Sequence, residues 1–425
     1  MASFSIPLSG LNADSTALNT IANDLANTGS TAFKSQTTNF ADLFYQQVGS
    51  TGSGDPIELG AGVKVATNET DFTQGSINPT GNPTDVALDG SGFFVVGAGD
   101  GSVEYTRAGN FALTAGGALV TSNGLSVLGY PAVNGVVNTN APLAPITIPV
   151  GQVQQPQATT TLNITANLDS SAAVGTQFPA QVTVYDSLGA PHVVTVNFTE
   201  TAANTWDYSA ALPAGDFASG VSTPITGTLN FDTSGNLASV TTGGVTTPVG
   251  TAPGDVSSIP LAFTGLADGA AGLNANWSFL GAGNTPTISQ VQAASGVSAT
   301  TQNGFAPGEY KGFTINGDGS VSVAYTNGQT QDVGQLALAN VTNLQGLQLL
   351  GNGDYATTLA SGSASVSVSG SAGLGTLEDG ALEGSNVNLS AEFSNLIVAQ
   401  RAFEANAKAV TTFDTVTEDT INLIR

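Results

Sequence analysis

The sequence of 425 residues contains no cysteine, one histidine and only seven lysine and arginine residues. Without cysteine the chain forms no disulfide bond and offers no thiolate for catalysis or metal binding. Because there is only one histidine as well, the usual zinc ligand sets and Cys–His catalytic pairs are excluded. That residue, His192, stands in "GAPHVV" before an apolar run, where we expect a surface or turn histidine. The composition argues against an enzyme, and we expect no catalytic residue, cofactor or metal site.

Basic residues are scarce relative to acidic ones, since seven Lys and Arg stand against 31 Asp and Glu and give a formal net charge of −24. Such a chain is repelled by nucleic-acid phosphates and by anionic membrane surfaces, so no nucleic-acid partner is expected. The sequence also lacks an apolar stretch of about 18 residues, so no membrane insertion is expected. Its start, "MASFSIPLSGLNADSTALNT", lacks the basic segment and apolar run of a Sec-type signal peptide. We therefore expect a protein that is either cytoplasmic or exported without cleavage.

Two short glycine-containing motifs suggest ligand chemistry but fail in their context. "GNGDYA" at 351–356 fits a loose dinucleotide-binding pattern, yet Ser and Gly follow it where a helix is needed. "NGDGS" at 316–320 resembles the start of a calcium loop, but Val321 and Asn327 occupy the positions that require Gly and Glu. The second motif is instead typical of a hairpin turn.

Turn-forming and β-forming residues are abundant, with 53 glycines and 18 prolines as punctuation. Apolar runs such as "DVALDGSGFFVV" and "QVTVYDSLGAPHVVTVNFTE" alternate with Gly-Gly, Asn-Gly and Asp-Gly turns, as β-hairpins require. Between about residues 150 and 296 strand-like runs recur about every ten residues, which predicts a β-sandwich or a barrel. The predicted fold class is mainly β with α-helical termini.

The segments follow one another in the order helix, β, inserted β, β and helix. This order predicts nested, discontinuous domains, with the two ends of the chain meeting in space. The predicted parts are a terminal helical coiled-coil domain at 1–30 and 378–425, an extended connecting region at 31–76 and 361–377, a β-rich body at 77–148 and 297–360, and an inserted outer β domain at 149–296.

Both ends of the chain carry apolar residues at helical spacing, and the C-terminal stretch "NLSAEFSNLIVAQRAFEANAKAV" contains neither Gly nor Pro. The predicted seam comprises Phe4, Leu11, Leu18, Leu25, Leu389, Phe393, Leu396, Phe403, Ala407, Val410, Ile421 and Ile424. A single amphipathic stripe cannot be buried within its own segment, so we expect the two ends to pair with each other and with other copies of the chain. The alternative is that each helix docks on the β body as an ordinary terminal helix.

Several segments resemble the flagellar axial proteins, the family of rod, hook and hook-associated proteins. "NDLANTGSTAFKS" at 23–35 is similar to the N-terminal signature of this family, and "ALEGSNVNLSAEFSNLIVAQRAFEANAKAV" at 381–410 is similar to its C-terminal signature. "YTRAGNFALTAGGALVTSNGLSVLGYPA" at 105–132 resembles the rod and hook body. "VTVYDSLGAPHVVTVNF" and "TQNGFAPGEYKGFTINGDGS" resemble the hook members. The likeness covers both ends and most of the body, and the middle region in patches.

The resemblance implies a subunit that polymerises into a curved, hollow tube outside the cell. Such a tube is a universal joint between rod and filament and a channel for exported chains. The implied partners are other copies of the chain, the flagellar rod, the hook cap, the hook–filament junction proteins and the type III export apparatus. The runner-up within this class is a distal rod or hook-associated protein, and the alternative from another class is a secreted, monomeric β-rich adhesin.

Seven positions are carried over from the family signatures: Asn27, Phe33, Lys34, Asn386, Gln400, Arg401 and Asn406. One position departs from the family, which usually has Gly before the Phe–Lys pair, whereas this chain has Ala32. If the turn at this position needs a positive φ, the alanine is strained.

Overall fold

The computed structural model describes residues 5–44, 46–50, 52, 56–99 and 101–423. The chain forms two compact units. The first unit comprises Met1–Val150, Gly312–Ala324 and Thr330–Arg425, and the second comprises Gly151–Lys311 and Tyr325–Gln329. The first unit is therefore assembled from both ends of the chain, while the second is inserted between them.

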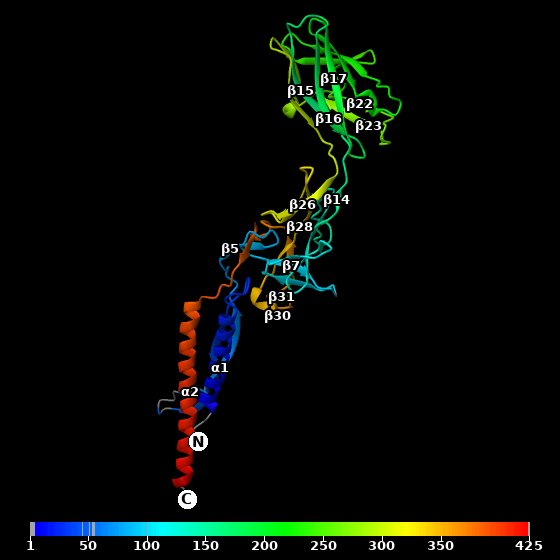
Figure 1. The fold of residues 1–425 in the computed structure, drawn as a ribbon. Helices are drawn as coiled ribbons and strands as arrows, with labels where there is room; N and C mark the ends of the chain where they lie inside the picture. The colour runs from blue at the N-terminus through cyan, green and yellow to red at the C-terminus, as the bar shows by residue number, and fades with distance from the viewer. Residues whose placement is uncertain (1–4, 45, 51, 53–55, 100, 424–425) are drawn as a thin grey trace. The chain divides into compact units, whose positions relative to one another are not determined.

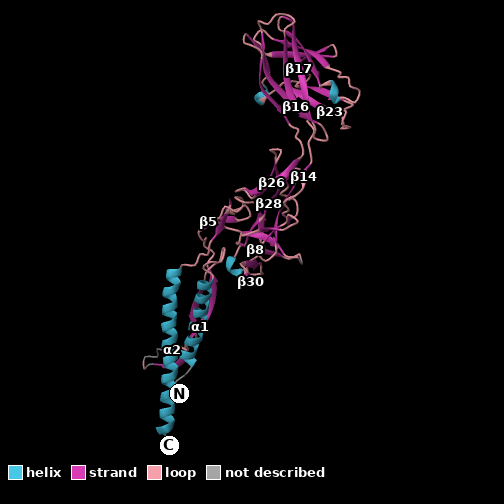
Figure 2. Cartoon of the chain, in the orientation of Figure 1, coloured by secondary structure: helices cyan, strands magenta, loops and turns pink. Residues whose placement is uncertain are grey.

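Two long helices lie near the ends of the chain, α1 at Ser5–Ala26 and α2 at Leu389–Leu423 (Figures 1 and 2). The Asn388 side chain caps α2 by accepting hydrogen bonds from the backbone N–H groups of Ser390 and Ala391. Among the described residues, no helix is long and apolar enough to cross a membrane.

The two helices lie side by side and run antiparallel (Figure 1). Asn406 of α2 donates a hydrogen bond of 2.8 Å to Asp14 of α1, and Glu392, earlier in α2, lies near Asp24, later in α1. Gly10 allows close approach in this region, since a Cβ there would lie 2.7 Å from the Asn406 amide nitrogen.

A β-ribbon packs on α1. It pairs β1 (Gln36–Asp42) with β4 (Val63–Thr70), and a second ribbon pairs β2 (Gln46–Ser50) with β3 (Pro56–Leu59). The Ser9 hydroxyl accepts a hydrogen bond from the Val63 N–H, and the Thr38 hydroxyl donates to Thr20. The contact between helix and ribbon therefore depends largely on polar side chains.

The β body of the first unit is built around one sheet with the strand order β27-β28-β11-β7-β8-β31-β30. The bounds of these strands are β7 Phe93–Gly97, β8 Val103–Thr106, β11 Ser126–Val133, β27 Ser320–Tyr325, β28 Thr330–Leu336, β30 Gln348–Gly351 and β31 Asp354–Ala356. Short strands extend it at the sides: β9 Ala112–Leu113, β10 Leu119–Val120, β12 Val136–Val137, β13 Ala144–Pro145, β29 Leu338–Asn340 and β32 Ser365–Ser367, with the 3-10 turn η3 at Leu344–Gly346.

Two short antiparallel pairs bring the two halves of the chain together beside this sheet. β5 (Ile77–Pro79) pairs with β34 (Ala381–Glu383), and β6 (Val86–Asp89) pairs with β33 (Thr376–Asp379). Segments about 300 residues apart in sequence are thereby hydrogen-bonded just before the chain enters α2.

The second unit is a β-sandwich. One sheet has the order β22-β23-β15-β24 with β25 beside β15, and the other has the order β16-β17-β18-β19-β20-β21. The bounds of these elements are β15 Thr161–Asp169, β16 Gln177–Tyr185, β17 Pro191–Ala202, β18 Thr205–Ala211, β19 Ile225–Phe231, β20 Leu237–Thr242, β21 Val245–Pro248, β22 Ser258–Phe263, β23 Leu273–Ser278, β24 Ile288–Val291 and β25 Gly296–Gln302, with η1 at Ala214–Asp216 and η2 at Ala282–Asn284. β14 (Val153–Gln154) pairs with the first residues of β26 (Gly308–Ile315) where the chain enters and leaves this unit.

Strict alternation of buried and exposed residues in β15 and β17 sends every second side chain into the space between the two sheets. Trp206, Tyr208 and Trp277 are fully or almost fully buried there, and both sheets contribute to one continuous apolar core. Trp277 packs edge-on against Tyr208 with ring centroids 5.4 Å apart. Face-to-face packing of two antiparallel-rich sheets is the arrangement that alternation along each strand favours.

The predicted fold class, mainly β with α-helical termini, is confirmed. Of the two arrangements predicted for the inserted strands, a sandwich or a barrel, the structure has the sandwich. "NGDGS" forms the predicted turn, since the Asn316 N–H donates to the Ser320 carbonyl between β26 and β27. The fourfold division of the chain stays a prediction, although β25 (Gly296–Gln302), which extends beyond the predicted boundary at residue 296, pairs with β15 of the second unit. The expectation for His192 is wrong, because its side chain is only 8 % exposed and is held by carboxylates.

Candidate assembly site at the paired chain ends

The first unit contains a buried ion pair where its two chain segments meet. The Lys34 ammonium lies 2.6 Å from Oε1 of Glu383, and neither side chain is exposed to solvent. Lys34 also donates to the Thr73 carbonyl, and the same Glu383 oxygen accepts the Gly75 N–H at 2.8 Å. Burial lowers the pKa of Lys34 from its ordinary value, even though Glu383 favours the charged form.

A second cation completes this cluster. Nη1 of Arg107 lies 3.3 Å from Oε2 of Glu383 and donates to the Leu88 carbonyl, while its Nη2 donates to the Gly90 carbonyl at 2.6 Å. The guanidinium also lies over the Phe93 ring, 5.7 Å from its centroid. One carboxylate therefore pairs with two buried cations that belong to distant parts of the sequence, and removing it leaves both without a partner of opposite charge.

The backbone around this cluster joins the two family signatures. The Asn386 side-chain oxygen accepts the Ser35 N–H at 2.8 Å, and its amide group donates to the Asp71 and Thr73 carbonyls. The Ala32 N–H donates to the Glu383 carbonyl at 2.8 Å. Ala32 has a φ of +54°, so the turn does adopt the conformation in which an alanine is strained.

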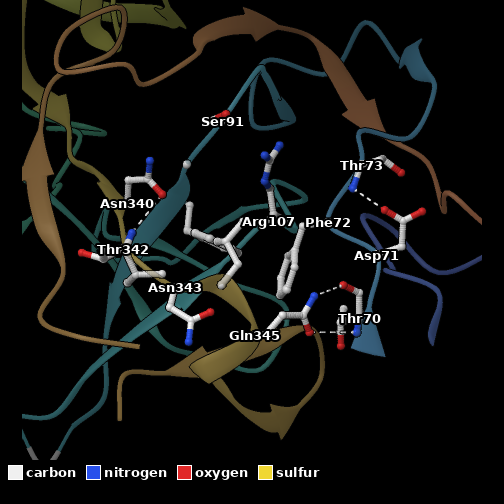
Figure 3. Close-up of a pocket in the computed structure, with 14 residues that line it drawn as sticks. Thr70, Asp71, Phe72, Thr73, Ser91, Arg107, Asn340, Thr342, Asn343 and Gln345 are labelled. Atoms are coloured by element: carbon white, nitrogen blue, oxygen red, sulfur yellow. Dashed lines mark hydrogen bonds between the residues drawn. The ribbon is translucent and has the colours of Figure 1, made fainter. Parts of the chain in front are cut away.

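A pocket of about 650 Å³ opens beside Arg107, and its walls come from residues 70–73, 91–93 and 340–345 (Figure 3). Gln345 closes one side by a pair of hydrogen bonds with the backbone of Thr70, at 3.2 Å from the Thr70 N–H and 2.8 Å to its carbonyl. Nε of Arg107 has no hydrogen-bond partner among the described residues. The pocket is thus another place where both halves of the chain are held together.

A further buried carboxylate of the first unit, Asp24 in α1, has no cation beside it in the described part of the chain. One oxygen accepts the Gln36 N–H at 2.9 Å, and the other has no hydrogen-bond partner there. Burial, with Glu392 nearby, raises the pKa of Asp24 to about 6 despite the hydrogen bond from Gln36. The contact of α1 with the ribbon and α2 therefore contains a carboxyl group with a pKa of about 6.

The predicted seam residues fall into two groups in the structure. Leu11, Leu18, Leu25, Leu396, Phe403, Ala407 and Val410 are half-buried, Leu389, Phe393 and Ile421 are exposed, and Phe4 and Ile424 lie outside the described residues. The residues of α1 that are most deeply buried are instead small or polar: Pro7, Gly10, Ala13, Thr20 and Asp24.

Pairing α1 with α2 leaves one face of α2 uncovered. Phe393 and Ile397 on this face are each more than half exposed, and Val416 and Ile421 expose further apolar surface toward the end of the helix. A helix that exposes large apolar side chains along its length typically packs against another protein surface.

The signature positions have distinct roles in this arrangement. Asn27 closes the end of α1 by accepting a hydrogen bond from the Ser30 hydroxyl, Phe33 is half-buried, and Asn406 joins the two helices. Gln400 and Arg401 are exposed on α2, where Arg401 pairs with Glu404 at 3.2 Å. Lys34 and Asn386 lie in the junction described above.

The sequence prediction missed Glu383, Arg107 and Asp24. Glu383 and Arg107 stand within the motifs "ALEGSN" and "YTRAGNF", so a signal was present. Since the chain has only seven basic residues, each one is a candidate for a structural ion pair. Nothing in the local pattern distinguishes Asp24 from an exposed helical aspartate.

Three protein family models match parts of the chain, and two of these parts overlap at residues 155–167. The "Flagellar hook protein FlgE/F/G D1 domain" matches residues 87–167, the "Flagellar basal body protein FlaE D2 domain" matches residues 155–305, and the "Flagellar basal body rod FlgEFG protein C-terminal" family matches residues 378–423. The crystal structure of the Helicobacter pylori flagellar hook protein FlgE2 superposes with a TM-score of 0.54 at 15% identity, covering 71% of this chain and 99% of that one. That similarity concerns the fold alone.

Relatives of known name extend over the full length. The flagellar hook protein FlgE of Salmonella typhimurium is 37% identical over 438 residues, covering 99% of this chain and 100% of the relative. The flagellar hook protein FlgE of Treponema pallidum is 35% identical over 467 residues, covering 98% of each chain. Agreement at this level from end to end shows that the chain belongs to the family of the flagellar hook protein FlgE.

Proposed function

We propose that the chain polymerises through its paired terminal helices into the curved, hollow hook, which joins rod to filament and forms an export channel. The observation that carries this proposal is the apolar surface that α2 exposes after pairing with α1, at Phe393 and Ile397. We expect other copies of the same chain to cover this surface, because a helix pair with one uncovered apolar face is only marginally stable by itself. The membership in a structural flagellar family agrees with this role.

The proposed partners beyond other copies are the rod, the hook cap and the hook–filament junction proteins. We further propose that the chain leaves the cell through the type III export apparatus, unfolded and without cleavage. The absence of cysteine suits such passage, since no disulfide forms before or after export. The polar flanks of the helices, rich in Asn, Gln, Thr and Ser, suit a channel to which unfolded chains do not adhere.

The test replaces one exposed apolar residue of α2 by a charge. Ile397→Asp is expected to abolish salt-induced assembly of the purified chain into tubes, as seen by electron microscopy, because a carboxylate in an apolar interface is costly. The matched control is Ser394→Asp, which adds the same charge at an exposed polar site on the preceding turn. Tubes of normal form from Ile397→Asp would contradict the proposed role of this surface.

Hydrogen exchange on the monomer and on the assembled material separates this proposal from the adhesin alternative. We expect amides of α1 and α2 to gain protection on assembly, because the apolar face becomes covered. Full protection of both helices in a monomer that never assembles would instead favour ordinary terminal helices on a monomeric protein.

A further inference from the structure

A cluster of three aspartates surrounds the only histidine of the chain, inside the second unit. His192 begins β17, and Asp186 lies in the turn between β16 and β17. Asp216 comes from η1, and Asp268 comes from the loop between β22 and β23. The cluster therefore joins segments of the two sheets of the sandwich.

The ring of His192 is oriented by one carboxylate and faces two others. Nδ1 lies 2.9 Å from Oδ2 of Asp216, while Nε2 lies 3.0 Å from Oδ2 of Asp186 and 3.8 Å from Oδ2 of Asp268. A carboxylate that accepts the Nδ1–H of a histidine and leaves Nε2 directed at other ligands is the usual outer shell of a metal-binding histidine.

The two facing carboxylates are held in place by the backbone. Oδ1 of Asp186 accepts the N–H groups of Leu188 and Ala190 at 2.8 and 2.9 Å, and Oδ1 of Asp268 accepts the Ala270 N–H at 3.0 Å. In both residues Oδ2 is thereby left to point toward the histidine. The ligand atoms of Asp186, His192 and Asp268 all lie within 4.8 Å of one another.

The cluster places three carboxyl groups around one imidazole ring. Burial disfavours the charged ring, but hydrogen bonds to Asp216 and Asp186 raise the pKa of His192 above its ordinary value. Burial also opposes the charge of Asp186, yet hydrogen bonds with Asp268, His192 and the backbone lower its pKa to about 2. The ring faces three carboxyl groups, and its single Nε2 position is directed at both Asp186 and Asp268.

We propose that Asp186, His192 and Asp268 bind a divalent transition-metal ion of the Zn²⁺ class, with Asp216 as the positioning residue of the histidine. Bonds of about 2.0–2.2 Å from one imidazole nitrogen and two carboxylate oxygens suit this ion, and water completes the coordination. Nε2 lies 3.0 and 3.8 Å from the two carboxylate oxygens, and the three ligand atoms lie within 4.8 Å of one another, so one ion can reach all three. The expectation that the chain has no metal site considered only His and Cys as ligands, and it left carboxylate ligands out.

The ion would link the two sheets of the sandwich. Asp186 and His192 belong to the sheet of β16 and β17, and Asp268 belongs to the loop of the other sheet. Binding to the folded unit alone raises its stability by mass action. Because a histidine nitrogen must be free of its proton to bind a metal ion, the affinity is expected to fall at acidic pH.

The experiment titrates the purified full-length monomer with Zn²⁺ by calorimetry at pH 7.5 and pH 5.5, and with Co²⁺ by visible absorption. We expect one equivalent to bind at pH 7.5, at least tenfold weaker binding at pH 5.5, and a higher midpoint for the unfolding of the second unit. Asp268→Asn and His192→Gln are each expected to reduce the affinity at least tenfold. The matched control, Asp207→Asn, removes an exposed aspartate of the same unit and leaves binding unchanged.

Two outcomes overturn the proposal. In the first, the wild-type chain binds no stoichiometric Zn²⁺ at pH 7.5, and unfolding responds to pH but not to the ion, which leaves a protonated histidine between carboxylates. In the second, Zn²⁺ binds equally to the wild type, Asp268→Asn and His192→Gln, which places the ion among other acidic groups. Tryptophan fluorescence shows whether the sandwich of each variant is folded, because both tryptophans lie in its core.

Discussion

The two units of the chain are stabilised in different ways. The second unit has a continuous apolar core in which Trp206, Phe198 and Trp277 are fully buried between two sheets. The first unit has a smaller apolar core around Phe93 and Tyr130. It also joins distant segments of the chain through a buried ion-pair cluster at Lys34, Arg107 and Glu383 and exposes apolar side chains on α2.

The difference indicates which unit can fold without contacts from another chain. Alternating strands close an apolar core without help from another chain, so the second unit should fold by itself. The paired helices expose an apolar face, and their contact with the ribbon is mainly polar, so their stability depends on what covers that face. Substitutions in each unit can test this contrast.

The largest effect is expected from Trp277→Ala in the second unit. Removing a fully buried tryptophan costs about 3–5 kcal/mol of unfolding free energy, because it loses burial and leaves a cavity beside Phe198 and Tyr208. Urea unfolding followed by the fluorescence of Trp206 measures the loss. Trp277→Phe, which keeps an aromatic ring, should lose much less. Hydrogen exchange at 30–40 should not change, and a parallel loss of protection there would contradict the independence of the two units.

The next effect is expected from Glu383→Gln in the first unit. The glutamine keeps the shape of the side chain but leaves Lys34 and Arg107 without a counter-charge, at a cost of about 3 kcal/mol. Hydrogen exchange should accelerate at 30–40 and 376–388, while the tryptophan transition of the second unit stays at the same urea concentration. The matched control is Glu378→Gln, which removes an exposed glutamate from the neighbouring strand β33. Equal effects of the two variants would exclude the buried cluster as the main link.

The sequence was sufficient for features with a regular period. The alternation in β15 and β17 and the uninterrupted helical stretch around Phe403 are local patterns, so strands, helices and the fold class could be predicted. The composition shift near residue 149 pointed to the insertion for the same reason.

The rest depends on contacts between residues that are far apart in the chain. Glu383 meets Lys34 across 349 positions, and Asp268 meets His192 across two sheets, and no periodicity encodes either contact. The predicted leucine seam also differs from the observed burial, because the ribbon and Asn406 select the small face of α1, at Gly10 and Ala13, as its most buried side.

A smaller effect concerns pH. The pKa of Asp24 is about 6 in the folded state against an ordinary value of 3.8, so the folded state takes up a proton between these values. The stability contributed by this group is full below about pH 4 and is lost as the pH rises through about 6. Asp24→Asn should remove this dependence and stabilise α1 at pH 7.5 by about 1 kcal/mol, because no buried charge remains. Hydrogen exchange of the α1 amides at pH 5.0 and 7.5, corrected for the intrinsic exchange rates, measures the stability of α1 at the two pH values. Asp14→Asn serves as the control, and an unchanged pH dependence in Asp24→Asn would assign the titration to another group.

The smallest effect tests the departure from the family signature. Ala32 has a φ of +54°, and an alanine in this conformation lowers the stability of the folded state by about 1–2 kcal/mol relative to glycine. Two effects partly offset this loss: the alanine buries its methyl group, and glycine loses more chain entropy on folding. Ala32→Gly is therefore expected to stabilise the junction by up to about 1 kcal/mol, seen as slower exchange of the Ser35 amide that bonds to Asn386. Ala41→Gly, in the extended strand β1, should have the opposite sign, because glycine brings only an entropic cost there. If both variants lose stability equally, the turn at residue 32 is not strained, and the alanine is an ordinary occupant of its place.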